Sequence, residues 1–462
     1  MNIKSVILTI VFGILTFGVS VTAQKLWTLE ECIAYAYDNN IEIKQSILSV
    51  NTADRDLLQS KLNIAPSLNA SASHAFGWGR SFDQSANRYA NNNTQQSYFS
   101  LNSQVTLFNG MQLINNVRQK QFDFLSQKYT SDKIRNDMSL NVAASYLLIL
   151  FNIELANNAQ RQVNISDEQI DRTKKQVDAG AISRGSLYDI EAQGAADDAN
   201  LVTAKNKVML AYLDLMQLLD MESNNEFDID KPIFEIVGTP TLLPAEMIYN
   251  KSVVIMPEIK SAEYKVESAL RGLSIVKGMR SPRLYASGSY GTNFSDQLMQ
   301  SYIPGQPGYD EMITFNTQFK ENRNGTISLG LSIPIFNGYQ VSTNIKMSEI
   351  YYESVTLNLE SEKLRLRKNI EAAYADAIAS YQTYLSRLKS VEAFDASFSF
   401  TEEKFNIGMV NSTDYNIVKI QLANAQADLA SSKFDYIFKT KILDFYLGKS
   451  MSLSDIANVK EN

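Results

Sequence analysis

Residues 326–338 read TISLGLSIPIFNG, and this stretch indicates the class of fold better than any other. Between Thr326 and Ile335, apolar side chains occupy every second position and small or polar residues occupy the positions between them. A period of two over about ten residues, with one apolar and one polar face, is typical of a transmembrane β-strand. Half-buried hairpins of soluble proteins share this period, so the segment alone leaves both interpretations open.

Three further segments alternate in the same way. They cover residues 68–78, 99–107 and 284–290. Together with 326–335 they predict two β-hairpins, at about 66–108 and 282–336. The loops expected inside the hairpins, Ser81–Gln96 and Ser295–Asn324, are polar and low in complexity. Such loops suit the extracellular side of a barrel, where they either bind a ligand or are simply solvated.

The chain is a tandem repeat. Leu107-Phe108-Asn109-Gly110 recurs as Ile335-Phe336-Asn337-Gly338, at an offset of 228 residues. Pro66–Ser71 recurs as Pro282–Ser287 at an offset of 216, so the extra residues lie in the second hairpin. Several landmarks in the same order predict one structural unit that is built twice.

Long helices follow each hairpin. From Met111 to about Asp178 the chain has neither Pro nor Gly, and apolar residues recur every seven positions from Ile149 to Val177. This spacing is typical of a coiled-coil seam, and a helix of that length would extend roughly 100 Å. Gly180 and Gly408 are expected to end the long helices, because glycine tolerates the left-handed backbone of a helix end.

A shorter helix is expected to return after each of these glycines, at Ser186–Leu219 and Thr413–Leu447. A helical stretch of about 35 residues is also expected to open each repeat, at Thr28–Lys61 and at Pro244–Lys277. Each repeat therefore has the order opening helix, β-hairpin and long helical hairpin.

Composition excludes several classes of function. The 462 residues include 43 Lys and Arg, 50 Asp and Glu, one His (His74) and one Cys (Cys32). A disulfide framework and a zinc site of several Cys and His ligands are impossible. A net charge of −7 argues against nucleic-acid binding. Catalysis by carboxylates alone stays formally open, but we predict no catalytic, cofactor-binding or metal-binding residues and no enzyme activity.

The first residues predict export. Residues 1–23 have a basic start, an apolar stretch and small residues at Val21 and Ala23, which indicate a signal peptide cleaved before Gln24. An uncleaved anchor helix is the alternative. No later window approaches 18 consecutive apolar residues, so no transmembrane helix is expected in the mature chain.

Four strands cannot stand alone in lipid. An open sheet leaves unpaired N–H and C=O groups at its edges, and each costs several kcal/mol in hydrocarbon. Other copies of the chain must therefore close the edges. Two copies would give eight strands and three would give twelve, and the pattern does not choose between them.

The order of these elements resembles the TolC family of outer-membrane efflux proteins, over essentially all of Leu26–Leu453. The resemblance is carried by the opening segment Thr28–Ala36, the two strand exits and the two helix-tip loops, Gly180–Leu187 and Gly408–Tyr415. It implies an α+β membrane protein with four transmembrane strands per chain and duplicated helical hairpins. It further implies a homotrimer with a 12-stranded barrel in outer-membrane lipid and a helical tunnel through the periplasm.

The resemblance also implies a function and partners. The chain would be the exit duct of a tripartite efflux or type I secretion system, and would work with a periplasmic adaptor protein and an inner-membrane pump. The alternative is an outer-membrane structural or recognition protein that acts through its long extracellular loops.

The expected organisation has five parts. They are the signal peptide 1–23, a first repeat 24–221 with its helical hairpin at about 111–219, a linker 222–243, a second repeat 244–448 with its helical hairpin at about 339–447, and a tail 449–462. In the TolC family the linker and tail form a belt around the tunnel.

The resemblance assigns roles to the helix tips. Gly408, Thr413 and Asp414 match the family's Gly-x-x-x-x-Thr-Asp-hydrophobic tip, at which the adaptor is expected to dock. The first tip keeps Gly180 but departs from the pattern with Ser186 and Leu187.

Helix capping is an alternative role for Ser186 and Thr413. Asp414 also matches an acidic position that narrows the periplasmic mouth in this family, where a ring of carboxylates would select cations. The family's second acidic gate position is Ile417 here, which puts a double acidic ring in doubt.

Aromatic residues near the strand ends are candidates for contact with the membrane interface. They are Phe76, Trp78, Phe99, Phe108, Tyr290, Phe294 and Phe336. Packing at the junction between barrel and helices is an alternative for Phe108 and Phe336.

Overall fold

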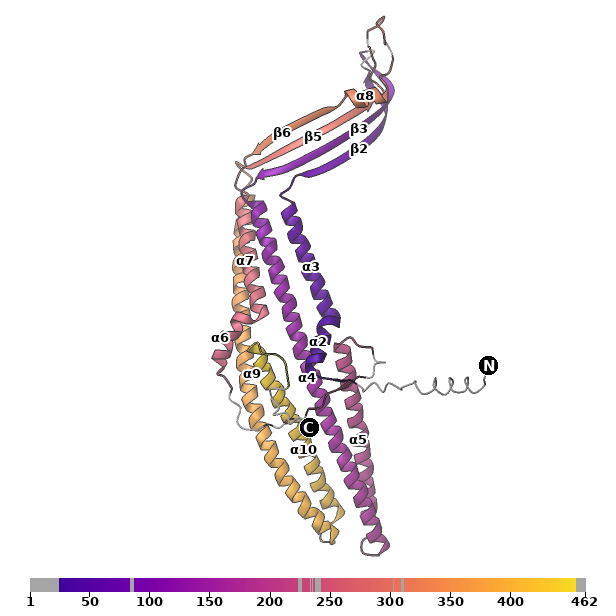
Figure 1. Ribbon diagram of the computed structural model, residues 1–462, viewed down its shortest axis with the longest axis vertical. Helices are drawn as coiled ribbons and strands as arrows, with labels where there is room; N and C mark the ends of the chain where they lie inside the picture. Colours follow the sequence, from indigo (N-terminus) through magenta and orange to yellow (C-terminus); the bar gives the residue numbers. More distant parts are fainter. Residues whose placement is uncertain are drawn as a thin grey trace, which may run out of the picture. The chain divides into compact units, whose positions relative to one another are not determined.

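The computed structural model describes residues 25–83, 87–222, 227–232, 234, 236, 242–301, 303–308 and 311–453 (Figure 1). The predicted signal peptide, residues 1–23, lies outside the described residues. The elements are, in chain order, β1 (Leu26–Trp27), α2 (Leu29–Asn39), α3 (Ile41–Leu62), β2 (Ser67–Asp83), β3 (Arg88–Phe108), α4 (Gln112–Asp178), α5 (Arg184–Leu218), β4 (Asp228–Ile229), α6 (Ala245–Ile255), α7 (Pro257–Gly278), β5 (Arg283–Ser295), α8 (Phe315–Glu321), β6 (Asn324–Ser332), α9 (Gln340–Asn406) and α10 (Ser412–Tyr446).

The helices repeat with the offsets found in the sequence. α2 and α6 each have 11 residues, and α3 and α7 each have 22, at an offset of 216. α4 and α9 each have 67 residues, and α5 and α10 each have 35, at an offset of 228. The two copies of the repeat thus share helix boundaries residue for residue.

Two compact units divide the chain, and each contains parts of both repeats. A helical unit comprises residues up to Ser46, Ser131–Met256 and Leu364 onward. A sheet unit comprises Ile47–Thr130 and Pro257–Lys363. The compact units therefore do not coincide with the sequence repeats, because α3, α4 and α9 contribute residues to both.

The sheet unit carries a four-stranded antiparallel sheet in the order β2-β3-β5-β6, which is curved (Figure 1). Its ladders place polar residues of all four strands on one face, since directly paired residues point the same way. On that face the hydroxyls of Ser71 and Ser100 lie 2.8 Å apart, and those of Ser287 and Ser328 lie 2.9 Å apart. The period of two predicted from the sequence thus gives the whole sheet a polar face.

The opposite face is apolar. In one row across this face, Ala70 of β2 pairs with Leu101 of β3, and Leu101 pairs in turn with Tyr290 of β5. A register shift between Thr106 and Phe108 turns Phe108 onto this face, opposite Leu284. Bulges re-aim side chains in this way at the ends of strands.

The first predicted loop, Ser81–Gln96, is wrong for most of its length. β2 continues to Asp83 and β3 begins at Arg88, so the pairing extends far into the Asn- and Gln-rich segment. Backbone pairing does not require apolar side chains where a strand is solvated on both faces. Polar composition therefore did not distinguish strand from loop here.

The second predicted loop, Ser295–Asn324, contains α8. Beyond Gly291 no residue of β6 pairs with β5, and amide side chains from the α8 region satisfy the backbone there instead. Gln318 accepts a hydrogen bond from the Ser295 N–H at 2.9 Å and donates to the Ser295 carbonyl at 2.8 Å. Asn322 donates to the Asn293 carbonyl at 2.8 Å. α8 thus covers a strand edge that would otherwise be open.

The helical stretch predicted at the start of each repeat is divided into two helices. One residue with extended backbone, Asn40 or Met256, separates α2 from α3 and α6 from α7. Met256 precedes Pro257, which disfavours helical backbone at the preceding residue. Asn40 has no such neighbour, but its side chain accepts a hydrogen bond from the Ile43 N–H and caps α3.

α4 has a window of 18 residues with mean hydropathy 1.5, long and apolar enough to cross a membrane. No helix able to cross a membrane was predicted here from the sequence. Of this window, 56% is buried within the described residues. Val142, Tyr146 and Ile149 of its apolar stretch belong to the core of the helical unit. A buried core helix passes the same test of length and composition, and we interpret the window in this way.

Candidate functional site

The tips of the two helical hairpins have the same backbone geometry. Gly180 and Gly408 have φ values of +73° and +76°. The Ala181 N–H donates to the Gln176 carbonyl at 2.9 Å, and the Met409 N–H makes the equivalent bond to Lys404 at 2.8 Å. These bonds close both long helices with a Schellman motif, which requires a left-handed residue at the glycine position.

The returning helices are capped by residues other than the two predicted candidates. Ser183 and Asn411 are the N-caps, and their side chains accept hydrogen bonds from the backbone N–H groups of Ser186 and Asp414. The capping role considered for Ser186 and Thr413 is therefore wrong, because both residues lie inside the first helical turn. The signal that could have identified the caps is a Ser or Asn directly before the first residue of each returning helix.

The tip residues differ in exposure. Gly180, Gly408, Thr413 and Asp414 are exposed, whereas Ser186 and Leu187 are half-buried. The second tip also exposes two apolar side chains that flank its glycine. They are Ile407 and Met409, with 70% and 71% of their surface accessible. Neither residue was predicted as a site residue, although apolar residues on either side of a tip glycine are a recognisable signal.

Behind the tips, an aromatic cluster joins the two hairpins of the helical unit. Tyr415 of α10 lies against Phe405 and Phe398 of α9, with ring centroids 4.9 and 5.6 Å apart, and Ile190 of α5 belongs to the same cluster. The Tyr415 hydroxyl is buried and has no hydrogen-bond partner among the described residues. Burial raises the pKa of this phenol above its usual value, and Glu402 adds to the effect.

Polar contacts join the same hairpins close to their tips. Arg172 of α4 lies 3.6 Å from the carboxylate of Glu402 on α9. The Ser412 hydroxyl at the start of α10 donates to Asp189 of α5 at 3.1 Å. The two tips therefore hold each other within one chain through both apolar and polar contacts.

A buried ion pair lies farther along the hairpins. Lys419 of α10 donates to Asp197 of α5 at 2.6 Å, and both side chains are almost fully buried. Ser166 of α4 accepts from Lys419 and donates to Asp197 at 2.5 Å, and Gln193 donates to the other carboxylate oxygen at 2.9 Å. Three helices are thus joined by charges that are costly to bury unless they are paired.

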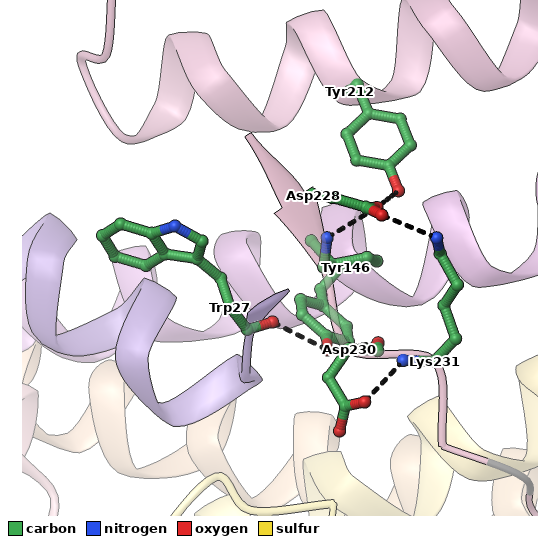
Figure 2. A network of polar contacts seen from close by, with 7 residues as sticks. Trp27, Tyr146, Tyr212, Asp228, Asp230 and Lys231 are labelled. Carbon is green, nitrogen blue, oxygen red and sulfur yellow. Dashed lines mark hydrogen bonds and ion pairs between the residues drawn. The ribbon is translucent and has the colours of Figure 1, made fainter. Parts of the chain in front are cut away.

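A second polar network fastens the linker between the repeats (Figure 2). The short strands β1 and β4 pair in parallel, Trp27 with Ile229, and the Asp230 N–H donates to the Trp27 carbonyl at 2.9 Å. The buried Tyr146 hydroxyl lies 2.7 Å from the Asp230 carbonyl oxygen, to which it donates. We call the contacts of Trp27, Tyr146, Tyr212, Asp228, Asp230 and Lys231 the linker latch.

Asp228 is the charged centre of the linker latch. It accepts hydrogen bonds from the Tyr212 hydroxyl at 2.5 Å and from the Lys231 ammonium at 2.8 Å. Burial alone would raise the pKa of Asp228, but the hydrogen bonds from Lys231, Tyr212 and the Ile229 N–H hold the pKa below its usual value. Burial and the bond to Asp228 raise the pKa of the Tyr212 phenol.

In the sheet unit, α7 packs against α4. Tyr264 of α7 stacks between Phe122 and Tyr129 of α4, with ring centroids 6.1 and 5.6 Å apart. The Ser261 and Ser126 hydroxyls lie 3.0 Å apart beside this stack. The contact joins the first repeat to the second within one chain.

Among the residues that the structure describes, the side chains able to bind a metal ion are not gathered into a site. Cys32 is buried, and burial, with Glu31 and Glu30 nearby, raises the pKa of its thiol to about 12. His74 lies on β2 with its Nδ1 2.8 Å from the Ser97 hydroxyl. Over the described part of the chain, no group of three or more His, Cys, Asp or Glu side chains could hold a metal ion.

Comparison with known proteins identifies the family. The outer membrane efflux protein family matches residues 33–220 and 249–448, which is most of the chain. Outer membrane protein TolC of Escherichia coli K12 is 22% identical over 457 residues, or 96% of this chain and 86% of that protein. Toxin and drug export protein A of Aggregatibacter actinomycetemcomitans is 21% identical over 426 residues, or 88% and 83%.

Solved channel structures share the fold. CusC matches with a TM-score of 0.77 at 15% identity, over 92% of each chain. The Campylobacter jejuni CmeC outer membrane channel matches with a TM-score of 0.74 at 15% identity, over 91% of this chain and 85% of that one. The predicted fold class is confirmed. The chain belongs to the outer membrane efflux protein family, whose members are exit ducts for efflux or secretion in the outer membrane with their helical part in the periplasm.

Proposed function

We propose that three copies of this chain form one duct, with a twelve-stranded barrel continued by a helical tunnel. The observation that supports this most is the two-faced sheet, in which β2 and β6 each pair on one side only within the described residues. Unpaired edges are too costly in hydrocarbon, so further copies must pair with them. A barrel of twelve strands would turn the apolar face to lipid and the serine-rich face to a water-filled lumen.

The internal repeat predicts which residues of two copies meet. The offset of 216 relates Tyr264 of α7 to Leu48 of α3. The offset of 228 relates the two α4 rings that enclose Tyr264, Phe122 and Tyr129, to Ile350 and Leu357 of α9. All three aliphatic side chains are exposed in the single chain, with 64%, 66% and 58% of their surface accessible. Leu48 of one copy would therefore lie between Ile350 and Leu357 of the next. We call this contact the aliphatic seam.

The helix tips are the proposed docking edge for a periplasmic adaptor protein, which connects the duct to an inner-membrane pump. The exposed apolar pair Ile407 and Met409 supports docking at the second tip, because exposed apolar side chains are typical of interaction surfaces. Thr413, four residues after Met409, is also exposed. At the first tip Leu187 is half-buried, and the exposed Tyr188 that follows it would be the apolar contact there.

Asp414 is the proposed gate residue at the periplasmic mouth. Its carboxylate is exposed at the first turn of α10, and its N–H is held by the Asn411 side chain at 2.8 Å. Three such carboxylates around a threefold axis would attract cations. Stabilising the start of a helix is the more ordinary role for an acidic residue there. Ile417, exposed one turn later, would make an apolar rather than a second acidic ring.

The linker latch suits a static role in this duct. It holds the described part of linker 222–243 against α4 and α5, and the tail residues Met451 and Leu453 are also buried. We propose that linker and tail form a belt around the helical tunnel. Transport would then be passive, and the duct would perform no chemistry.

Single-channel conductance of the detergent-purified protein in a planar lipid bilayer tests this proposal. Small, steady, cation-selective openings are expected, and Asp414→Asn should raise conductance and reduce cation selectivity. If Asp414→Asn changes neither quantity, the gate role is wrong. Absence of conductance in both proteins would count against a duct.

A further inference from the structure

The hairpin of β2 and β3 extends beyond the apolar part of the sheet. On the apolar face, the residues of β3 from Phe108 to Phe99 cover nine steps, about 30 Å along the strand at 3.3 Å per residue. With a strand tilt of about 40°, that is roughly 23 Å of height, close to the apolar band of about 25 Å in outer-membrane barrels. Hydrocarbon should therefore end near Phe99.

Beyond Phe99 the same face changes chemistry. Gln95 lies opposite Phe76, Asn93 opposite Trp78, Asn91 opposite Arg80, and Tyr89 opposite Phe82. We call these eight residues the outer hairpin face. Gly79, with φ of +126°, lies within this ladder without shifting its register. The result is a row of aromatic rings and one cation beside a row of amides.

The rings of this face are open to solvent. Trp78 has 82% of its surface accessible, and Phe76, Phe82 and Tyr89 are also exposed. At the end of the ladder Phe82 lies 5.5 Å from Tyr89, and the Arg80 guanidinium lies 5.6 Å from the same ring. Aromatic side chains so exposed are unusual unless something covers them.

The register separates the predicted interface aromatics into groups. Phe99, Phe108, Tyr290 and Phe294 lie within or at the edge of the apolar band, where contact with lipid stays a prediction. Phe336 lies outside the strands. Phe76 and Trp78 lie four and six residues beyond the Phe99 level, about 10–15 Å above it at the same tilt. The acyl chains of the lipid do not reach that height.

We propose that the outer hairpin face binds the saccharide headgroups of the outer-leaflet lipoglycan. The face continues the lipid-facing surface outward, so the layer that it meets directly above the hydrocarbon is the headgroup layer. Ring faces pack against the C–H faces of sugars, amide groups exchange hydrogen bonds with sugar hydroxyls, and Arg80 pairs with phosphate. The inference depends on the barrel orientation and not on the number of copies or on the gate.

Trp78 reports on its own contact. The sequence has two Trp residues, Trp27 and Trp78, so Trp27→Phe leaves Trp78 as the sole tryptophan fluorophore. The probe is the core oligosaccharide released from lipopolysaccharide by mild acid, which carries no acyl chains. We expect a saturable change in Trp78 fluorescence and protection from acrylamide quenching. Asn93→Ala with Gln95→Ala should weaken the binding about tenfold or more, as expected for the loss of ~1.4 kcal/mol of hydrogen bonding.

A matched control is available on the same strand. Tyr98 is exposed on the polar face, so Tyr98→Ala in the same background should leave the titration unchanged. The proposal fails if the oligosaccharide gives no saturable change. It also fails if phosphatidylglycerol vesicles without sugar give the same change, which would identify a lipid-interface girdle. Equal binding by the Asn93/Gln95 variant would likewise overturn it.

Discussion

Leu48→Asp is expected to weaken the association of copies through the aliphatic seam. Complete burial of a Leu or Ile side chain contributes about 1.5–3 kcal/mol. Leu48, Ile350 and Leu357 have 64%, 66% and 58% of their surface left to bury, so the three together would stabilise each contact between copies by about 3–6 kcal/mol.

An aspartate at position 48 removes its share of that energy and places a carboxylate between two aliphatic side chains. The desolvation of an unpaired carboxylate costs several kcal/mol. A loss of about 3–5 kcal/mol per contact lowers the association constant by roughly 10²–10⁴. Leu48→Met keeps the apolar volume and should associate like the unaltered chain.

The mass of the detergent-solubilised protein, measured by sedimentation at several concentrations, reports the association. The Leu48→Asp protein should dissociate to single chains at concentrations where Leu48→Met remains assembled. The seam is wrong if the Leu48→Asp protein stays assembled at every concentration at which Leu48→Met does.

A cysteine pair tests the same geometry without placing a charge in the aliphatic seam. Cys32 is buried and its thiol has a raised pKa, so the background for oxidative cross-linking is low. Leu48→Cys with Ile350→Cys should give bonds between chains. Phe122→Cys with Tyr264→Cys, the equivalent pair inside one chain, should close within the chain. If only the pair at positions 122 and 264 forms a disulfide bond, the contact between copies predicted from the internal repeat is wrong.

Three further predictions concern contacts within one chain. Lys419→Met should destabilise the fold by about 3–5 kcal/mol, because it leaves the Asp197 carboxylate buried and unpaired. The double variant Lys419→Met with Asp197→Leu should lose less free energy of unfolding, and thermal unfolding measures both proteins. Tyr415→Phe should raise stability by about 1 kcal/mol in the same assay, since it removes a buried hydroxyl without a partner, and a loss of stability would indicate a partner in the assembled duct. The Asp228 carboxyl has a lowered pKa in the folded chain. Its contribution to the free energy of folding is therefore complete above the pKa of an unfolded aspartate, near 3.9, and is lost as pH falls through the pKa of the folded state. Protection of the linker from an acid-active protease should decline over that range, and Asp228→Asn should remove this pH dependence.

Much of the fold was predictable because it depends on local signals that occur twice. Tip glycines ended the long helices where expected, at Gly180 and Gly408, because a Schellman end needs left-handed backbone. The alternation from Thr326 onward identified a sheet with one apolar face. A second copy of each signal at a constant offset separates such patterns from chance.

Other features depend on contacts between distant residues, and the sequence could not supply them. The break at Asn40 follows from its own side chain capping α3, and nothing in the local composition requires it. The pairing of β2 with β3 in an Asn-rich segment depends on register rather than on apolar content. The buried pair of Lys419 and Asp197 has no local signal, because its members are 222 positions apart in the chain and meet only when α5 and α10 pack.

The proposed contacts within and between copies differ in chemistry, and the difference suggests an order of assembly. Inside the chain, stacked rings around Tyr264 and hydroxyl bonds at Ser261 join the repeats, and such directional contacts need their partners held in place. Between copies, the seam at Leu48 would be aliphatic and tolerant of approach angle, since apolar burial is non-directional. A chain could therefore complete its helical contacts first and meet its neighbours afterward. The edges β2 and β6 would pair last, because only the assembled barrel satisfies them in lipid.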